Sequence, residues 1–306
     1  MKANRSVGMI GLGIMGSAMA SNLMRAGFRV VGYDVLPPAR RAFARAGGIA
    51  AHSNAEVARR APIVVTSLPS VAALEAVAHE LARAPRKGLI VVETSTLPLA
   101  AKEAARNALA RKAITLLDCP LSGTGAQARN KDLSVYASGP RAACRACEDV
   151  FAGFARAHYY LGAFGTGIKM KFIANLLVAI HNVAAAEALV LAKKAGLDPA
   201  HTLKVVGDGA GSSRMLQVRG PMIVADDYRE ATMKVDVWQK DMHLIADFAT
   251  SLDCPTPLFA ACAPLYTAAM AAGYAKQDSG SVGAVLGKMA GLAGGRHRAP
   301  RAMSQG

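Results

Sequence analysis

The sequence predicts an α/β domain with a parallel sheet, followed by an all-α domain that a long helix joins to it. Three observations lead to this fold class. Short apolar runs of β type alternate with Ala-rich helical segments up to about Tyr160, which is typical of βαβ units. A glycine-rich turn follows the first apolar run. Beyond Gly165 the β pattern ends and only helical segments follow.

Length and composition agree with two domains. The chain has 306 residues, and 52% of them are hydrophobic, which is enough to bury a large core. Only 5% are aromatic, so aliphatic side chains must fill the core, as is common where helices cover a parallel sheet. We expect an α/β domain at 1–164, a helical domain at 165–292 and a basic, disordered tail at 293–306.

The expected strands of the first domain are short and apolar, and each ends at Gly, Pro or a polar turn. They are Val7–Ile10, Arg29–Tyr33, Ile63–Ser67, Leu89–Glu93 and Thr115–Leu117, with Leu133–Ala137 and His158–Leu161 as later strands at the far edge. Helices are expected between them, for example at Ser17–Ala26 and Leu99–Arg111.

The second domain is expected to open with a helix from Thr166 to Ala195, far longer than the average helix. Gly196 ends it, and Asp198-Pro199 opens the next helix. Further helices are expected near Pro199–Val206, Ser213–Val224, Met233–Ser251, Thr256–Ala272 and Ser281–Ala290.

The turn after the first strand carries the motif G-x-G-x-x-G. Gly11 permits the tight turn, Gly13 lets a pyrophosphate approach the backbone, and Gly16 lets helix and strand pack closely. N–H groups at the start of the helix then face the phosphate charge. Since Asp34 ends the second strand at the expected distance, the pattern predicts a Rossmann domain that binds a dinucleotide. The expected phosphate-binding loop is Gly11, Leu12, Gly13, Ile14, Met15 and Gly16.

Asp34 bears on the choice of cofactor. A carboxylate there accepts hydrogen bonds from the adenosine ribose hydroxyls and repels a 2′-phosphate, so we expect NAD. Arg40 and Arg41 follow within two turns and are candidates to hold that phosphate, which keeps NADP as the alternative. We interpret both arginines as solvated helix residues.

The formal net charge of +15 raises the question of an anionic partner. The positive residues are scattered and no basic block is interleaved with aromatics, so we expect no nucleic-acid binding. The most apolar stretch, 172–192, contains Asn175, His181, Asn182 and Glu187; we interpret it as a buried helix with a polar stripe and expect no membrane contact.

Five cysteines without framework spacing indicate reduced thiols and a cytoplasmic protein. Cys144 and Cys147 form a lone C-x-x-C, and no second pair completes a zinc site. No other cluster has metal-ligand spacing, so no metal is expected. The N-terminal run resembles a signal peptide, but cleavage after Ala20 would remove the glycine loop, and we do not expect secretion.

The stretch GMIGLGIMGSAMASNLMRAGFRVVGYD closely resembles the start of the β-hydroxyacid dehydrogenases, and four further motifs follow in the family's order. TSLPS and ETSTL resemble two cofactor-contacting loops, DCPLSG the substrate loop, GTGIKMKFIANLL the catalytic helix, and QKDM a Lys-Asp pair late in the chain. Five motifs in register cover almost the whole chain. The resemblance therefore implies an NAD(P)-dependent oxidoreductase that acts on a short hydroxycarboxylate.

The resemblance also assigns roles to residues. Lys171 aligns with the catalytic lysine and Asn175 with its partner, and both are implied to contact substrate. Ser122 and Gly123, with Thr124 beside them, match the loop that holds the substrate carboxylate. The remaining implied cofactor contacts are Leu68, Pro69, Thr96 on the nicotinamide side, and Lys240.

The physical pattern of the long helix agrees with these roles. Lys171, Asn175, Val178 and Asn182 lie on one stripe. A lysine on a mostly apolar helix facing a closed cleft loses hydration, which lowers its pKa toward the range useful for acid–base catalysis. Lys169 is interpreted as a surface lysine.

The substrate loop departs from the family's pattern. Thr124 replaces a usual glycine, Ala126-Gln127 replaces a Gly-Ala pair, and Lys131 replaces another glycine. Substrates of the 3-hydroxyisobutyrate, tartronate semialdehyde/glycerate and threonate types therefore all stay open, although 209–223 and 227–242 look closer to the threonate and tartronate branch.

Two alternatives remain beside this interpretation. One is an imine reductase-like enzyme on the same fold, which the combination of Lys171 with the P-x-S-G loop disfavours. The other is a non-catalytic dinucleotide-binding module. A 6-phosphogluconate dehydrogenase would need a much longer helical domain. Related enzymes are oligomers, so we expect a homodimer or homotetramer, with the second domain supplying substrate and subunit contacts.

Overall fold

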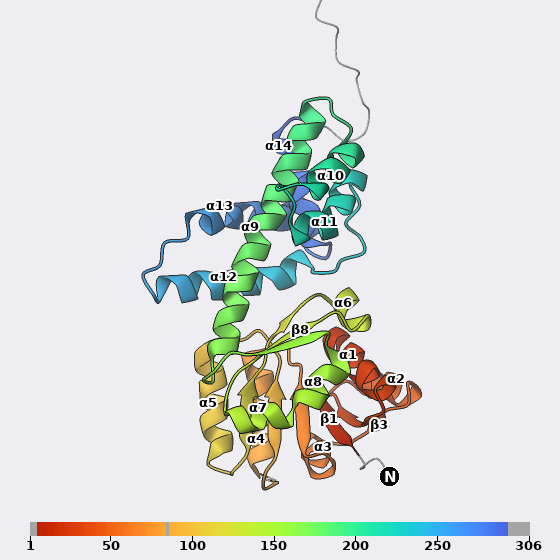
Figure 1. Ribbon diagram of the computed structural model, residues 1–306, viewed down its shortest axis with the longest axis vertical. Coiled ribbons are helices and arrows are strands. Elements are labelled where there is room, and N and C mark those ends of the chain that lie inside the picture. The colour runs from red at the N-terminus through yellow and green to blue at the C-terminus, as the bar shows by residue number, and fades with distance from the viewer. Residues whose placement is uncertain (1–4, 84–85, 293–306) are drawn as a thin grey trace, which may run out of the picture. The chain divides into compact units, whose positions relative to one another are not determined.

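The computed structural model describes residues 5–83 and 86–292 (Figure 1). Its described residues form two compact units, the first ending at Ile173 and the second beginning at Ala174. The first unit contains the parallel sheet and the second is helical, as the sequence predicts. The tail expected at 293–306 lies outside the described residues.

The first unit is built on a six-stranded parallel sheet in the order β3-β2-β1-β4-β5-β6. Its strands are β1 (Ser6–Ile10), β2 (Arg29–Tyr33), β3 (Ile49–Ala50), β4 (Ile63–Thr66), β5 (Ile90–Glu93) and β6 (Thr115–Asp118). The order reverses between β1 and β4, and in such sheets ligands bind at this switch point, beyond the carboxyl ends of the strands. Of these six strands, only β3 is not expected from the sequence.

Helices cover both faces of this sheet because successive strand residues point to opposite sides. Met9 and Val65 pack with α1 (Ile14–Arg25), α2 (Pro37–Arg45), α7 (Arg141–Ala146) and α8 (Glu148–Phe154). Their neighbours Ile10 and Val64 pack with α3 (Asn54–Arg60), α4 (Val71–Arg83) and α5 (Leu99–Ala110). A strand that is buried on both faces has a continuous run of apolar residues. This is why the central strands can be located from the sequence.

One sequence-based expectation about the sheet is wrong. The segments expected as its later edge strands instead form a separate three-stranded sheet in the order β7-β8-β9. It consists of β7 (Leu121–Ser122), β8 (Ser134–Ala137) and β9 (Ala157–Tyr160). Between β7 and β8 lies the five-residue helix α6 (Gly125–Arg129), which is too short for a parallel crossover. The chain therefore turns back, and β8 pairs antiparallel to β7.

The helical segments follow α9 (Thr166–Lys194), which runs from the first unit into the second. They are α10 (Pro199–Asp208), α11 (Arg214–Ala225), α12 (Val235–Thr250), α13 (Pro257–Ala269) and α14 (Val282–Met289). The helix expected to reach Ala272 becomes a π-helical turn at Met270–Tyr274, which contains Gly273 at φ 89°. A 3₁₀ turn at Ser279–Ser281 precedes α14.

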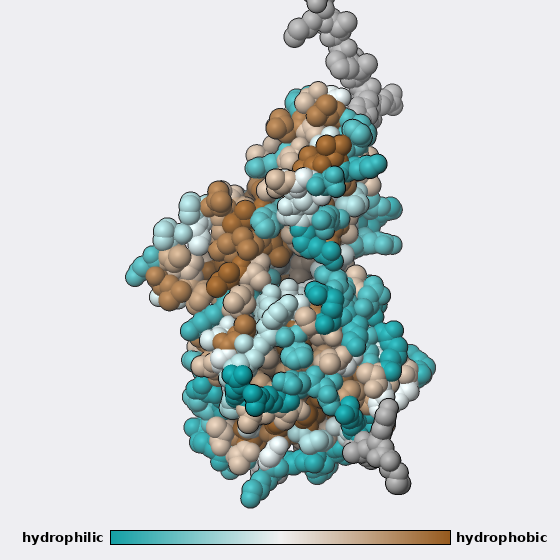
Figure 2. All heavy atoms as spheres, viewed as in Figure 1, coloured by the Kyte–Doolittle hydropathy of each residue, from teal (hydrophilic) through white to brown (hydrophobic). Residues whose placement is uncertain are grey.

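The second unit exposes many apolar side chains. Figure 2 shows hydrophobic residues gathered over the region of α12 and α13. Its exposed large hydrophobic side chains include Leu177, Leu191, Val237, Leu252 and Leu258, with exposed fractions of 46–69%.

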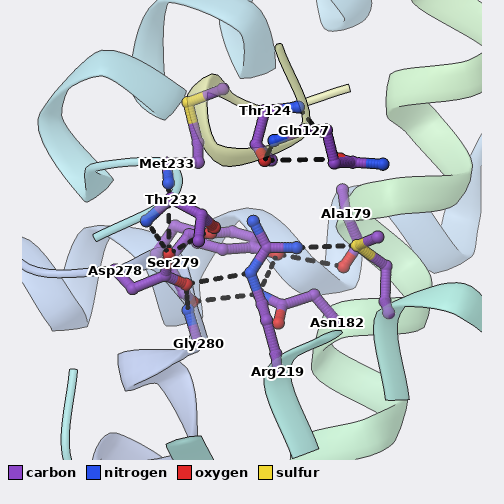
Figure 3. Close-up of polar contacts among 12 residues, drawn as sticks. Thr124, Gln127, Ala179, Asn182, Arg219, Thr232, Met233, Asp278, Ser279 and Gly280 are labelled. Carbon is purple, nitrogen blue, oxygen red and sulfur yellow. Dashed lines mark hydrogen bonds and ion pairs between the residues drawn. The ribbon is translucent and has the colours of Figure 1, made fainter. Parts of the chain in front are cut away.

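The interior of the second unit contains a polar network (Figure 3). The Asn182 amide donates to the Tyr266 hydroxyl and to the Ser279 carbonyl, both at 2.9 Å. The Arg219 guanidinium pairs with Asp278 at 2.9 Å, and the two side chains are 2% and 0% exposed. The network ties α9, α11, α13 and the 3₁₀ turn together.

By length and composition alone, α9 would also suffice to cross a membrane, the one such helix among the described residues. A buried core helix of a protein that spans no membrane can meet the same criterion. The polar stripe of α9 is buried, with Asn175 5% and Asn182 1% exposed, and it binds partners inside the second unit. We therefore describe α9 as the core helix of that unit.

Candidate functional site

The carboxyl ends of the parallel strands bring most of the expected site residues of the first unit to one edge of the sheet. The glycine loop follows β1, Asp34 follows β2, the Leu68–Pro69 segment follows β4, and Thr96 follows β5. Hydrogen bonds join neighbouring loops here: the Ser67 N–H donates to the Ile10 carbonyl at 2.9 Å, and the Cys119 N–H donates to the Glu93 carbonyl at 2.8 Å.

The glycine loop has the close contacts that its motif requires. Gly11 has φ 87°, and a Cβ there would lie 2.1 Å from the Ser67 carbonyl oxygen. A Cβ on Gly16 would lie 1.9 Å from the Gly11 carbonyl oxygen. α1 begins at Ile14, three residues before the expected start at Ser17, and Gly16 is buried within it.

Gly13 differs, since nothing lies within 4 Å of a Cβ built on it. It is the N-cap of α1 and provides no side-chain cap, and the first turn of the helix contains no acidic residue. The amides of Ile14, Met15 and Gly16 are thus without a side-chain cap at the positive end of the helix. This arrangement fits the pyrophosphate of a dinucleotide.

Asp34 is half-buried and orders the same loop. One carboxylate oxygen accepts the Leu12 N–H at 2.7 Å, and the other accepts the Leu36 N–H at 2.8 Å. The Arg40 guanidinium lies 5.4 Å from the centre of the Tyr33 ring and donates to the Asp34 carbonyl at 2.6 Å. Arg40 is therefore held beside Asp34, whereas Arg41 is exposed. The sequence interpretation of Arg40 as a merely solvated residue is wrong.

The loops after β4 and β5 are connected by a side chain that the sequence analysis did not single out. The Ser95 hydroxyl accepts the Leu68 N–H at 2.8 Å. Pro69 is exposed and Thr96 is partly buried. Ser95 thus links Leu68 to the segment that carries Thr96.

The substrate loop begins at β7, where Ser122 is partly buried. Gly123 has φ 133°, and a Cβ there would lie 2.6 Å from the Leu133 side chain. Thr124 caps α6 with a capping box, in which the Gln127 side chain accepts the Thr124 N–H at 3.0 Å. The Thr124 hydroxyl takes part in this cap, which gives the residue a structural role in addition to the expected one.

Lys171 lies in the second turn of α9, with 9% of its surface exposed. Lys169, two residues earlier, is exposed. A lysine is rarely this buried, so the two side chains differ in environment as the sequence pattern predicts. Lys171 belongs to the first unit, while Asn175, one turn further along the same helix, belongs to the second.

In the second unit Asp241 connects the other two expected residues. Its carboxylate accepts the Asn175 amide at 2.9 Å and pairs with Lys240 at 3.4 Å. Asp241 is 6% exposed, whereas the Lys240 side chain is 42% exposed. Asp241 is not among the site residues expected from the sequence. Its position on the apolar face of α12, beside Trp238 and Met242, is the signal that identifies it, since a buried carboxylate requires partners.

A buried cluster of charges lies below the loops of the first unit. The Lys102 ammonium is 2.6 Å from Glu93 and 2.7 Å from Asp118, and all three side chains are 0% exposed. Burial alone would lower the pKa of Lys102, but the two carboxylates outweigh it and raise that pKa. The sequence analysis did not identify Lys102, although it occupies the apolar stripe of α5 with Ala105 and Leu109.

The cysteines are free thiols, and only Cys254 is exposed. Burial raises the pKa of Cys144 to about 11 and that of Cys147 to about 12. Both thiols are therefore protonated and unreactive at neutral pH. Among the described residues, no group of three or more His, Cys, Asp or Glu side chains is arranged to hold a metal ion.

Comparison with known proteins gives one consistent result over both units. Residues 6–162 match the model of the NAD binding domain of 6-phosphogluconate dehydrogenase, and residues 165–286 match that of the NAD-binding domain of NADP-dependent 3-hydroxyisobutyrate dehydrogenase.

Individual relatives cover nearly the whole chain. An L-threonate dehydrogenase of Cupriavidus necator is 37% identical over 91% of this chain and 95% of its own length. The mitochondrial 3-hydroxyisobutyrate dehydrogenase of Bos taurus is 33% identical over 92% and 87%. The crystal structure of a 3-hydroxyisobutyrate dehydrogenase from Salmonella typhimurium is similar with a TM-score of 0.82 and 33% identity, covering 92% of this chain and 99% of that one.

Proposed function

The chain belongs to the β-hydroxyacid dehydrogenase family, whose members are NAD(P)-dependent oxidoreductases, and we propose that it oxidises or reduces a short hydroxycarboxylate with Lys171 as the general acid and base. The observation that carries this proposal is the burial of Lys171 at 9% exposure beside exposed Lys169, in the helix that resembles the family's catalytic helix. This contrast is what a lysine selected for proton transfer requires.

Each part of the candidate site has one proposed role. The glycine loop and the uncapped start of α1 would hold the pyrophosphate, the Leu68 loop would contact the cofactor, and Thr96 would contact its nicotinamide side. A nicotinamide bound there would supply the hydride in reduction and accept it in oxidation. Ser122 and Gly123 hold the substrate carboxylate. Lys171 Nζ takes the hydroxyl proton in oxidation and returns it in reduction, while Asn175, fixed by Asp241 at 2.9 Å, orients the substrate.

Substituting two lysines of α9 tests the proposal. Lys171→Ala should lower kcat by about 10²–10⁴-fold, the usual contribution of general acid–base catalysis, while NADH binding measured by fluorescence stays nearly intact. Lys169→Ala is the matched control and should remain within a few-fold of the wild type. If Lys171→Ala keeps more than about a tenth of the activity, or if Lys169→Ala is the inactive variant, the assignment is wrong.

For the cofactor we propose a preference for NAD within the NAD(P) class. The support is Asp34, which follows β2 and whose carboxylate accepts the Leu12 N–H and would repel a 2′-phosphate. Arg40 argues for NADP, but it is engaged with Tyr33 and the Asp34 carbonyl. The ratio of kcat/KM for NAD to that for NADP tests this preference. The double substitution Asp34→Asn with Val35→Arg should shift the ratio toward NADP. A tenfold preference of the wild type for NADP would contradict the proposal.

The substrate is proposed to be a three- or four-carbon hydroxycarboxylate of the 3-hydroxyisobutyrate, glycerate or threonate type. The relatives named for threonate and 3-hydroxyisobutyrate each match more than nine-tenths of this chain. A panel of these acids, followed by the absorbance of the reduced nicotinamide, identifies the best one. Activity on cyclic imines but on no hydroxyacid would instead favour an imine reductase-like enzyme.

We further propose that the protein is a cytoplasmic homodimer or homotetramer. The apolar side chains that α9, α12 and α13 expose, including Leu177, Val237 and Leu258, exceed what isolated surface residues explain. We propose that a second copy of the chain covers them. Light scattering at micromolar concentration should give at least twice the monomer mass. A monomer would overturn the proposal, and cell fractionation tests the location.

A further inference from the structure

The buried cluster Lys102–Glu93–Asp118 lies where two strands end. Glu93 is the last residue of β5 and Asp118 the last residue of β6, and the two strands are paired neighbours. Lys102 reaches them from the first turn of α5, at 2.6 and 2.7 Å. The ammonium therefore lies between two carboxylates. Without it they would repel each other, because no water reaches the buried pair to screen their charges.

The second oxygen of each carboxylate binds a segment of the candidate site. Glu93 Oε1 accepts the Ser95 N–H at 2.8 Å, and the Ser95 hydroxyl in turn accepts the Leu68 N–H at 2.8 Å. On this side the cluster fixes the two loops expected to contact the cofactor.

On the other side the cluster fixes the start of α9. Asp118 Oδ2 accepts the Ile168 N–H at 2.8 Å and the Ser138 hydroxyl at 3.2 Å, and that hydroxyl accepts the Gly167 N–H at 3.0 Å. A Cβ on Gly167 would lie 2.7 Å from the Asp118 carbonyl oxygen, so the helix is pressed against the strand end. Lys171 follows Ile168 by three residues, about one helical turn.

The charges of the cluster do not cancel. One ammonium and two carboxylates leave a net charge of −1, and the positive end of α9 lies against it through Ile168. Burying three charges costs desolvation energy that their attraction barely offsets, so such a cluster is poor evidence for stability alone. Its geometric effect is definite: one side chain sets the position of two loops and one helix start.

We infer that Lys102 is a positioning residue for the reaction. It holds Glu93 and Asp118, and through them it fixes the Leu68–Thr96 loops relative to the first turns of α9, which carry Lys171. The inference rests on the proposed function, because the position of Lys171 matters only if Lys171 transfers the proton. Displacements of about 1 Å cost roughly 10²-fold in rate when reacting groups must be aligned.

The test separates positioning from stability with two variants. Lys102→Met leaves two buried carboxylates without their counter-charge, so its melting temperature should fall. Lys102→Met with Glu93→Gln removes one charge of each sign, and the side-chain carbonyl introduced by Glu93→Gln can still accept the Ser95 N–H. This double variant leaves one buried carboxylate, Asp118, which keeps its hydrogen bonds from Ile168 and Ser138, so it should regain part of the melting temperature lost in Lys102→Met. Lys112→Met, at an exposed lysine of the same unit, is the control.

In the double variant kcat should remain about tenfold or more below the wild type, while KM for the hydroxyacid changes less than about threefold. The primary isotope effect with deuterated NADH should increase because hydride transfer becomes slower. A purely structural role would restore kcat together with the melting temperature and leave the isotope effect unchanged, and that result overturns the inference.

Two further measurements keep the test decisive. Glu93→Gln alone retains the Lys102–Asp118 pair and balances the cluster charge, so it should fold even if the double variant does not. It should show a kcat lowered by about threefold and a raised isotope effect, and wild-type values for both would overturn the inference. Lys171→Ala is assayed in parallel: if it stays active, the proposed function fails, whereas an inactive Lys171→Ala with a fully active double variant rejects only the role of Lys102.

Discussion

Each unit of the molecule contains a buried ionic cluster, but the two clusters form hydrogen bonds to different kinds of segment. In the first unit Lys102 joins two strand ends whose carboxylates bind loops and a helix start at the candidate site. In the second unit Asp278 pairs with Arg219, and its remaining partners include the N–H groups of Thr232, Met233 and Gly280. Those partners belong to the connection before α12 and to the 3₁₀ turn.

This difference shows that burial of a charge does not by itself indicate function. The Asp278 carboxylate accepts hydrogen bonds from backbone N–H groups of a turn and a loop. These groups have no partner in a helix or strand, so the role of Asp278 is structural. Asp118 also satisfies a backbone group, but that group begins the helix that carries Lys171. The partners of the carboxylate, and not its burial, distinguish the two cases.

The largest effect is expected from Arg219→Met. The substitution leaves Asp278 buried without its cation, which typically costs about 3–5 kcal/mol of stability. Because the pair lies in the second unit, urea unfolding monitored by Trp238 fluorescence should report the loss. Arg229→Met removes an exposed pair with Asp227 and should leave the midpoint unchanged. Equal effects of the two substitutions would remove the contrast between buried and exposed pairs.

A medium effect on stability is expected from changes of pH. Acid should destabilise the second unit, and alkali should destabilise the first. Burial would raise the pKa of Asp278, but Arg219 and the backbone donors outweigh it and hold that pKa below its usual range. The stability it contributes is present above the unfolded value of about 3.9 and is lost as the pH falls through the folded one. Lys102 has a raised pKa, so its contribution is present below about 10.4 and is lost as the pH rises.

Melting temperatures between about pH 2 and 11 check these signs. Asp278→Asn should flatten the acid limb alone, and the Lys102→Met, Glu93→Gln double variant should flatten the alkaline limb alone. If either variant changes the opposite limb, the assignment of the two limbs to the two clusters is wrong.

The smallest effect concerns thiols. Cys254 is exposed, whereas Cys119, Cys144 and Cys147 are buried in the first unit and Cys262 in the second. A thiol reagent should modify Cys254 first under native conditions, with no loss of activity, and Cys254→Ser should abolish the fast phase. Rapid modification of the first-unit thiols would show that this unit opens more readily than its buried core implies.

Features with local signals could be predicted from the amino-acid sequence alone. The glycine loop, Asp34 at the end of β2 and the helical stripe of α9 are patterns within a few turns of chain, and the structure contains all three. The helix boundaries given from the sequence agree with the structure to within three residues, and the largest differences are at the start of α1 and the end of α13.

Contacts between distant side chains, in contrast, became visible only in the folded chain. The sheet β7-β8-β9, the Lys102 cluster and the Asn175–Asp241 contact depend on segments up to 66 residues apart. Lys102, Glu93 and Asp118 each look like an ordinary charged residue in the sequence. Their partners become neighbours only when the parallel strands align their carboxyl ends, because a buried charge is tolerated only where the folded chain supplies its counter-charge.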